Sequence, residues 1–243
     1  MAHPLMQSVA DLLFPAQCLC CDARVETDHT LCAACWRQTP FIFGLACDLC
    51  GVPLPGADPG VPVHCDDCMA LARPWARGRA VMLYRDNARR MVLALKHGDR
   101  TDMARTAGRW MAAAAAPLLA PETLVIPVPV HWTRLVRRRY SQSALLAQEV
   151  ARAAGRDCRV DLLVRRRRTP MLDGKGRDQR FAMLDGAISA HPRRGAALAG
   201  RDVLVVDDVM TSGATLAASA DAARRAGARS VSVLVLARVA KDA

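Results

Sequence analysis

The sequence predicts an α/β protein in which a doubly wound parallel sheet follows a small metal-binding segment. Three observations lead to this prediction. Apolar runs alternate with amphipathic segments over residues 73–243, four C-x-x-C pairs fall within the first 70 residues, and one apolar run ends in two aspartates and a loop of small residues. We therefore divide the chain into two domains, residues 1–72 and residues 73–243.

The expected strands are apolar runs without polar alternation, which is typical of parallel strands buried on both faces. They lie at 79–85, 123–130, 158–167, 201–209 and 230–239. The expected helices are amphipathic or alanine-rich, and they lie at 88–99, 101–119, 141–155 and 211–228. Strands and helices that alternate in this way form a sheet with helices on both faces.

Composition narrows the class of protein. The chain has 243 residues and is 52% hydrophobic, which is enough for a packed core. Its start lacks a basic region and carries Asp11, which argues against a signal peptide. The longest apolar stretch, residues 110–121, is short and interrupted by proline, whereas a membrane span needs about 20 residues. We expect a cytoplasmic protein without membrane insertion.

Eight of the ten cysteines form the four C-x-x-C pairs. Two such pairs can direct four thiolates at one ion, which is the tetrahedral shell that structural zinc prefers. The expected ligands are Cys18, Cys21, Cys32, Cys35, Cys47, Cys50, Cys65 and Cys68. We expect two structural Zn²⁺ ions, each held by two sequential pairs, and we expect metal binding to drive folding of this segment.

Other interpretations of these cysteines stay open. They are disulfides, redox pairs, packing cysteines without metal, and interleaved rather than sequential pairing. Redox pairs are expected singly at a strand–helix junction, so four copies of the motif disfavour them. His64, directly before Cys65, is an alternative ligand, and Cys20 is expected to be a spare thiol.

The charge is strongly positive and concentrated in arginine runs. The formal net charge of +11 falls to roughly +7 once eight thiolates and two Zn²⁺ ions are counted. Arginines gather at 134–139 and 165–168. Such a surface favours a nucleotide or nucleic acid, although a solvated arginine-rich surface explains it equally well. With 4% aromatic residues, we expect little material for a platform that stacks single-stranded bases.

The stretch VLVVDDVMTSGATL, residues 203–216, predicts a strand, an acidic pair, a loop and a helix that starts near Thr215. Ligands of doubly wound sheets bind beyond the carboxyl ends of strands, and backbone N–H groups at a helix N-terminus suit a phosphate. Gly213 permits close backbone approach, and the two carboxylates can accept hydrogen bonds from vicinal hydroxyls or help to hold Mg²⁺. The stretch indicates a sugar-phosphate site; an ordinary capping turn after a buried strand is the alternative.

This stretch resembles the ribose-phosphate signature of type I phosphoribosyltransferases. The chain as a whole resembles the ComF family of competence-related proteins and the GntX-type proteins. The resemblance rests on the order of its features, which are the cysteine pairs, YRDNARRMVLALKHGDR (84–100), VIPVPVHWTRLVRRRYSQSALLAQEVA (125–151) and then this stretch. The resemblance covers nearly the whole chain. It implies a double zinc ribbon, a phosphoribosyltransferase-like domain, and phosphoribosyl pyrophosphate (PRPP) with Mg²⁺ as ligands.

The resemblance also implies roles for individual residues. Asp207 and Asp208 would hold the ribose hydroxyls and would be catalytic only in positioning the sugar. The loop that cradles the 5-phosphate would comprise Thr211, Ser212, Gly213, Ala214 and Thr215, and Val209 and Met210 before it are also expected to contact PRPP. Further PRPP contacts are expected from Lys96, from Val128, Pro129 and Val130 near the pyrophosphate, and from Arg138.

The chain departs from the family pattern around the expected hood over the base. Arg139 stands for a glycine, Ser141 for an asparagine, Leu172 for a glutamine and Met183 for an asparagine, while Arg180 is kept. Thr211 stands where purine salvage enzymes carry an acidic general base. The acceptor of the ribosyl group is therefore undefined by the resemblance.

Two classes of function fit these features. The first is a PRPP-binding, phosphoribosyltransferase-like protein that serves natural transformation or DNA uptake and, if catalytic, displaces pyrophosphate at ribose C1. The alternative is a non-enzymatic zinc-ribbon adaptor that binds single-stranded DNA or a protein of the DNA-uptake machinery. Sheets of this kind commonly dimerise, so a homo-oligomer is compatible with either.

Overall fold

A four-stranded parallel sheet forms the centre of the molecule, with the strand order β1-β6-β5-β2. The structure is a computed structural model, and it describes residues 15–97, 100–133, 136, 140–167, 176–184 and 186–240. The strands are β1 (Arg77–Leu83), β2 (Leu124–Pro127), β5 (Asp202–Met210) and β6 (Ser230–Arg238). The predicted α/β class with a parallel sheet is confirmed.

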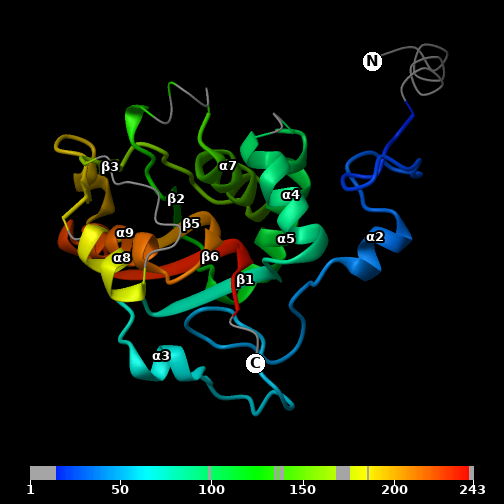
Figure 1. The fold of residues 1–243 in the computed structure, drawn as a ribbon. Coiled ribbons are helices and arrows are strands. Elements are labelled where there is room, and N and C mark those ends of the chain that lie inside the picture. Colours follow the sequence, from blue (N-terminus) through cyan, green and yellow to red (C-terminus); the bar gives the residue numbers. More distant parts are fainter. Residues whose placement is uncertain are drawn as a thin grey trace.

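Helices cover both faces of this sheet (Figure 1). One face packs against α4 (Asp86–His97), α5 (Met103–Ala115) and α7 (Gln142–Ala154). The other face packs against α9 (Ala214–Arg225) and part of the cysteine-rich segment. Both faces of β5 are therefore buried, which explains why its sequence lacks polar alternation.

The outer edge of β1 is covered by the chain that links the two halves of the cysteine-rich segment. The N–H of Ile42 donates to the carbonyl of Val81, and the N–H of Leu83 donates to the carbonyl of Pro40, each at 2.9 Å. An open edge strand presents unpaired backbone groups to other chains, so this antiparallel pairing closes the sheet on that side. The two short helices of the segment, α2 (Ala33–Gln38) and α3 (Asp66–Ala70), lie on either side of this crossing.

Glycines let the turn at residues 47–51 touch β1 directly. A Cβ atom at Gly78 would lie 2.2 Å from the carbonyl oxygen of Leu49, and one at Gly51 would lie 2.4 Å from the nitrogen of Ala80. Only a hydrogen fits at either place, so this turn and the strand pack backbone against backbone.

The cysteine-rich segment shares its core with the sheet. Cys47, Cys50 and Cys68 belong to the same buried cluster as the inward side chains of β5 and β6. The boundary at residues 72 and 73 stays a prediction, and the two parts pack as continuous structure across it.

The prediction of one strand at 158–167 is wrong. Cys158 forms a single parallel bridge with Val125, and the chain then leaves the sheet. Its later part, β3 (Leu163–Arg165), pairs antiparallel with β4 (Ile188–Ala190) in a separate two-stranded sheet. The physical reason is the arginine run that starts at Arg165, because consecutive arginines are incompatible with a strand buried on both faces.

Prolines and glycines set several element ends. Helix α5 ends at Ala115, where Pro117 leads into a short 3₁₀ turn (η1, Ala116–Leu118), and a second 3₁₀ turn is η2 (Gly195–Leu198). Helix α7 begins after Ser141, whose hydroxyl accepts from a backbone N–H, and ends at a left-handed Gly155, as its sequence predicts. Across the described ranges, no helix has the length and apolar character that a bilayer crossing requires.

Candidate functional site

Asp207 and Asp208 lie at the carboxyl end of β5, at the centre of the sheet. In the register of the sheet, Val206 is paired with Pro127 of β2, and the N–H of Val128 donates to the carbonyl of Val206 at 2.9 Å. Val128 therefore lies beside the strand position that precedes the acidic pair, and the role of residues 128–130 in ligand binding stays a prediction. This edge is where ligands of doubly wound sheets bind.

Two helices contribute polar partners to the acidic pair. The Ser143 hydroxyl, from α7, donates to Oδ1 of Asp207 at 2.7 Å, and the N–H of Asp208 donates to the same oxygen at 2.9 Å. Lys96, in the last turn of α4, places Nζ 3.0 Å from Oδ2 of Asp208. The structure thus brings Lys96 and the two aspartates together, while the sequence alone could only align Lys96 with a family position.

The pKa of Asp207 is raised to about 7. Burial contributes most to the increase, and the neighbouring Asp208 adds to it. The Ser143 hydroxyl, the Asp208 N–H and Lys96 act in the opposite direction. The side chain is therefore costly to ionise in the free protein, which is the state expected of a group whose ligand supplies missing hydrogen-bond donors or a cation.

The loop after β5 has the geometry of a phosphate cradle. Gly213 takes a left-handed conformation (φ 84°) and caps α9, which begins at Ala214 rather than Thr215. The first N–H groups of a helix have no intrahelical acceptor and lie at the positive end of its dipole. The loop residues from Thr211 to Thr215 therefore offer backbone donors to an anion.

Two arginines donate hydrogen bonds to the carbonyls of the loop. Arg238, at the end of β6, donates through Nη1 to the carbonyls of Thr211 at 2.6 Å and Met210 at 3.3 Å. Arg73 donates through Nη1 to the carbonyl of Ser212 at 2.8 Å. These hydrogen bonds fix the conformation of the loop, and within it the N–H of Ala214 donates to the hydroxyl oxygen of Ser212 at 3.4 Å.

A third arginine reaches the loop from helix α8 (Arg177–Leu184). Arg180 donates through Nη1 to the hydroxyl of Thr211 at 2.9 Å. Met183 lies on the same helix, so this family departure does fall close to the site. Arg138, Arg139 and Leu172 lie outside the described residues, as do Arg134 and Arg168 of the two arginine runs.

Ser143, Arg73 and Arg238 were missed by sequence reasoning. A signal existed for Arg238, because it is the single charged residue of its strand and ends the apolar run VLVLA. Ser143 and Arg73 carry no comparable signal, since each joins the site through tertiary packing alone.

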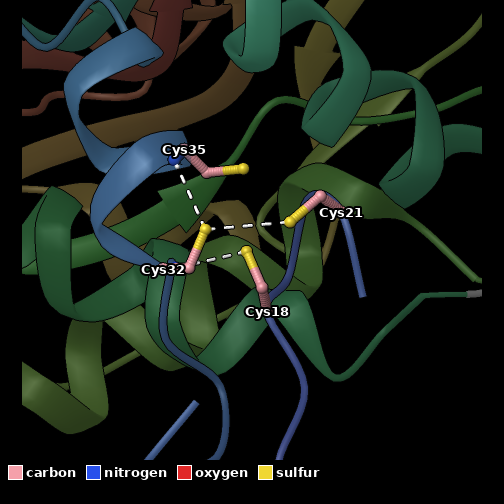
Figure 2. A group of neighbouring side chains, drawn as sticks. All are labelled: Cys18, Cys21, Cys32 and Cys35. Atoms are coloured by element: carbon pink, nitrogen blue, oxygen red, sulfur yellow. Dashed lines mark hydrogen bonds between the residues drawn. The ribbon is translucent and has the colours of Figure 1, made fainter. Parts of the chain in front are cut away.

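The cysteine sulfurs converge in two groups that follow the sequential pairing. Within each group all sulfurs lie within 4.8 Å of one another, and the groups are Cys18, Cys21, Cys32 and Cys35 (the first tetrad, Figure 2) and Cys47, Cys50, Cys65 and Cys68 (the second tetrad). Backbone N–H groups point at the sulfurs; for example, the N–H of Cys32 donates to Sγ of Cys18 at 3.3 Å. Cys20 and His64 belong to neither group.

The sulfur spacing fits tetrahedral zinc. A Zn–S bond of about 2.3 Å implies neighbouring sulfurs about 3.8 Å apart. Cys21 and Cys32 are separated by 3.7 Å between sulfurs, as are Cys50 and Cys65. The two tetrads are therefore consistent with structural zinc, which would be held by four thiolates at each site.

Arg73 also lies close to the second tetrad. Cys47 and Cys50 raise the pKa of the Cys68 thiol, as does burial, whereas a hydrogen bond from Arg73 acts to lower it. The same guanidinium that donates to the Ser212 carbonyl thus interacts with a tetrad cysteine.

Several of the chain's few aromatic residues lie together in the structure. Trp36, Phe41, Phe43 and Trp110 form one cluster, with ring centroids 4.5 Å apart for Trp36 and Phe41 and 5.2 Å apart for Phe41 and Trp110. Trp36 is 46% exposed and Phe43 is 75% exposed. Next to this cluster, a groove of about 570 Å³ is lined by Arg37, Arg85 and Arg90, among others. Two exposed rings and several arginines therefore lie on one surface, although aromatic residues make up only 4% of the chain.

Comparisons with known proteins match both parts of the chain. Residues 9–69 match a double zinc ribbon domain, and residues 141–243 match a phosphoribosyl transferase domain. DNA utilization protein YhgH of Salmonella typhimurium is 30% identical over 234 residues, which cover 93% of this chain and 99% of that protein. Competence protein F of Haemophilus influenzae is 26% identical over 235 residues, which cover 93% of this chain and 98% of that protein.

One solved structure, of the allosteric regulatory enzyme of purine biosynthesis, aligns with 59% of this chain and 30% of its own at 20% identity, with a TM-score of 0.39.

Replacing Asp207 by Asn should stabilise the ligand-free protein in a pH-dependent way. Since the folded pKa is about 7 and the ordinary value is 3.8, the folded state holds the proton longer than the unfolded state, and wild-type stability falls as pH rises between these values. Asn keeps an acceptor for Ser143 and carries no charge. At pH 8 the variant should melt at least about 2–4 °C above the wild type, and this difference should shrink at pH 5. An equal difference at both pH values in thermal unfolding would contradict the raised pKa.

Proposed function

We propose that this chain, which belongs to the ComF family, binds PRPP at the carboxyl end of β5. Proteins of this family join a double zinc ribbon to a phosphoribosyltransferase-like domain. One observation carries the proposal. An acidic pair and an arginine-braced loop at a helix N-terminus lie side by side on consecutive residues, 207–215. A ribose with a 5-phosphate presents vicinal hydroxyls for the acidic pair and a dianion for the loop.

The ligand would use the groups already described. The 5-phosphate accepts from the N–H groups of residues 211–215, and the ribose hydroxyls donate to Asp207 and Asp208. Lys96, now paired with Asp208, would supply a cation for the pyrophosphate, and Val128 lies beside the strand position that precedes the acidic pair. Mg²⁺ bound with PRPP would balance the charge of the pyrophosphate.

Turnover at this site would be a displacement at ribose C1. The bond from C1 to the pyrophosphate oxygen breaks, the pyrophosphate leaves with the electron pair, and a nucleophile forms the new bond to C1. Asp207 and Asp208 position the sugar in this step and move no proton. Thr211 offers no general base, so a nucleophile that can attack without first losing a proton suits the site best.

We propose further that both tetrads hold Zn²⁺ and that the metals are structural. Each tetrad supplies four thiolates, which completes the tetrahedral shell and leaves no open position for chemistry. The short α2 and α3 helices, of six and five residues, are too short to be stable without such cross-links.

A second candidate function, binding of single-stranded DNA, is favoured by the aromatic cluster. Exposed rings stack on bases of any sequence, and arginines beside them contact phosphates. Trp36 and Phe43 supply the rings, and Arg37, Arg85 and Arg90 supply the charge. The names of the relatives, DNA utilization protein and competence protein, agree with a DNA partner and support a competence-related role.

Replacing both Asp207 and Asp208 by Ala should weaken PRPP binding by about 100-fold or more, because two charge-assisted hydrogen bonds of about 1.5–3 kcal/mol each are lost. Calorimetric titration of the zinc-loaded protein with PRPP and Mg²⁺ measures this. Asp202→Asn is the matched control, since Asp202 lies at the opposite end of the same strand and pairs with Arg229. Equal PRPP affinity in the double variant and the wild type would show that the acidic pair does not contact PRPP.

Replacing Cys32 and Cys35 by Ser should reduce the zinc content from two to one per chain and loosen the first tetrad region. Cys20→Ser is the control, and it should keep both ions because Cys20 lies outside the tetrads. Metal analysis of the purified proteins decides the matter, and two bound ions in the double variant would show that the ligands are misassigned.

Replacing Trp36 and Phe43 by Ala should weaken binding of a fluorescent oligothymidine at least tenfold, since each stacked base contributes about 1–3 kcal/mol. Val61→Ala, which removes another exposed apolar side chain, should leave the affinity unchanged. Fluorescence anisotropy at two salt concentrations measures both. If the wild type and both variants bind DNA with the same affinity, this surface is not the DNA-binding site.

A further inference from the structure

The second tetrad is connected to the phosphate loop through two side chains. The first is Trp75, whose indole N–H donates to the carbonyl of Leu49 at 2.7 Å. Leu49 lies between the tetrad residues Cys47 and Cys50, so this hydrogen bond ends inside the metal-binding turn. Trp75 is also buried in the same apolar cluster as both cysteines.

The second connecting side chain is Arg73. Its guanidinium carbon lies 5.3 Å from the centroid of the Trp75 ring, and its Nη1 donates to the carbonyl of Ser212 at 2.8 Å. A Cβ atom at Gly213 would lie 2.9 Å from that nitrogen and 3.3 Å from the Trp75 ring. The indole, the guanidinium and the loop are therefore in direct contact, and no space separates them.

We propose that the second tetrad positions the phosphate loop through Trp75 and Arg73, so that metal binding at this tetrad and ribose-phosphate binding are thermodynamically coupled. The inference rests on the proposed function, because it concerns the same PRPP loop. Coupling of this kind is reciprocal: if the bound metal strengthens PRPP binding, PRPP strengthens metal binding by the same factor.

The physical basis is pre-organisation. A metal at the second tetrad fixes the turn at residues 47–51, which fixes the acceptor for Trp75 and hence the surface on which Arg73 stacks. Arg73 can then hold the Ser212 carbonyl without losing further conformational entropy when the phosphate arrives. Without the metal, the ligand would have to order the turn, the indole and the guanidinium as well as its own loop.

The first tetrad makes its contacts elsewhere. Asn87 of α4 donates to the carbonyl of Cys35 at 3.2 Å, and Thr106 of α5 donates to the carbonyl of His29 at 2.6 Å. These helices cover the opposite face of the sheet from α9. The coupling is therefore expected for the second tetrad and not for the first, which provides an internal control.

The test uses the full-length, zinc-loaded protein and three variants. Trp75→Phe keeps an aromatic ring but removes the indole donor, and Arg73→Gln removes the cation at a position outside the fully buried core. Thr106→Val removes a single hydrogen bond to the first tetrad region and is the matched control. Two quantities are measured for each: the affinity for PRPP with Mg²⁺ at two zinc ions per chain, and the rate of zinc release to a chelator with and without PRPP.

We expect zinc release in two phases, one accelerated by Trp75→Phe and the other by Thr106→Val. PRPP should slow the Trp75-sensitive phase of the wild type about tenfold, within the usual range of coupling between sites, and leave the other phase unchanged. Trp75→Phe and Arg73→Gln should each weaken PRPP binding about tenfold and reduce this protection. Thr106→Val should bind PRPP like the wild type.

The outcomes separate this inference from the proposed function. Absence of PRPP binding by the wild type would overturn both. The coupling alone would be overturned if the wild type binds PRPP, if Trp75→Phe and Arg73→Gln bind it with unchanged affinity, and if PRPP does not slow zinc release. If Trp75→Phe fails to fold, Arg73→Gln decides between these outcomes.

Discussion

The burial of β5 on both faces is the constraint on which the site depends. This strand lies between β6 and β2 in a parallel sheet, so its middle is buried and polar side chains are confined to its two ends. Asp207 and Asp208 lie in its carboxyl-terminal part, directly after the last pair with β2. Because all four strands run in the same direction, the ends of β2 and β6 reach the same edge, and Lys96 and Ser143 approach it from helices on one face.

The site carries a charge balance that is suited to an anionic sugar. Two carboxylates face one lysine, and three arginines, Arg73, Arg180 and Arg238, surround the loop. Arg73 and Arg238 are committed to carbonyls, so they fix the shape of the loop rather than bind the ligand. The raised pKa of Asp207 shows that the free protein holds this group at a cost, which is common where a binding site is built in advance of its ligand.

The cysteine-rich segment is part of the same body as the sheet. Residues 40–42 close the edge of β1, and the turn at residues 47–51 packs against its backbone. The second tetrad packs on one face of the sheet, whereas the first tetrad region contacts α4 and α5, which cover the other face. This arrangement connects the second tetrad with the loop at residues 211–215, through Trp75 and Arg73, although the two are far apart in the chain. It also places an exposed aromatic cluster at the junction of the two parts.

Local patterns were predictable, and contacts between distant residues were not. The C-x-x-C pairs and the acid–loop–helix stretch are encoded by neighbouring residues, so the sequence identified the tetrads and the loop. Ser143 and Arg73 join the site only through packing, and Trp36 and Trp110 meet across α2 and α5 from positions far apart in the chain. The strand expected at 158–167 failed because its apolar start outweighed the arginines that follow, although these exclude it from a buried sheet.

The most direct measurement is a crystal structure of the zinc-loaded protein with PRPP and Mg²⁺, recorded with anomalous data at the zinc edge. The account predicts one anomalous peak in each tetrad, a 5-phosphate within hydrogen-bond distance of the N–H groups of residues 211–215, and ribose hydroxyls on Asp207 and Asp208. The account would be contradicted if the ligand density lies in the groove of Arg37, Arg85 and Arg90 and the acidic pair still contacts Lys96 and Ser143 without the ligand.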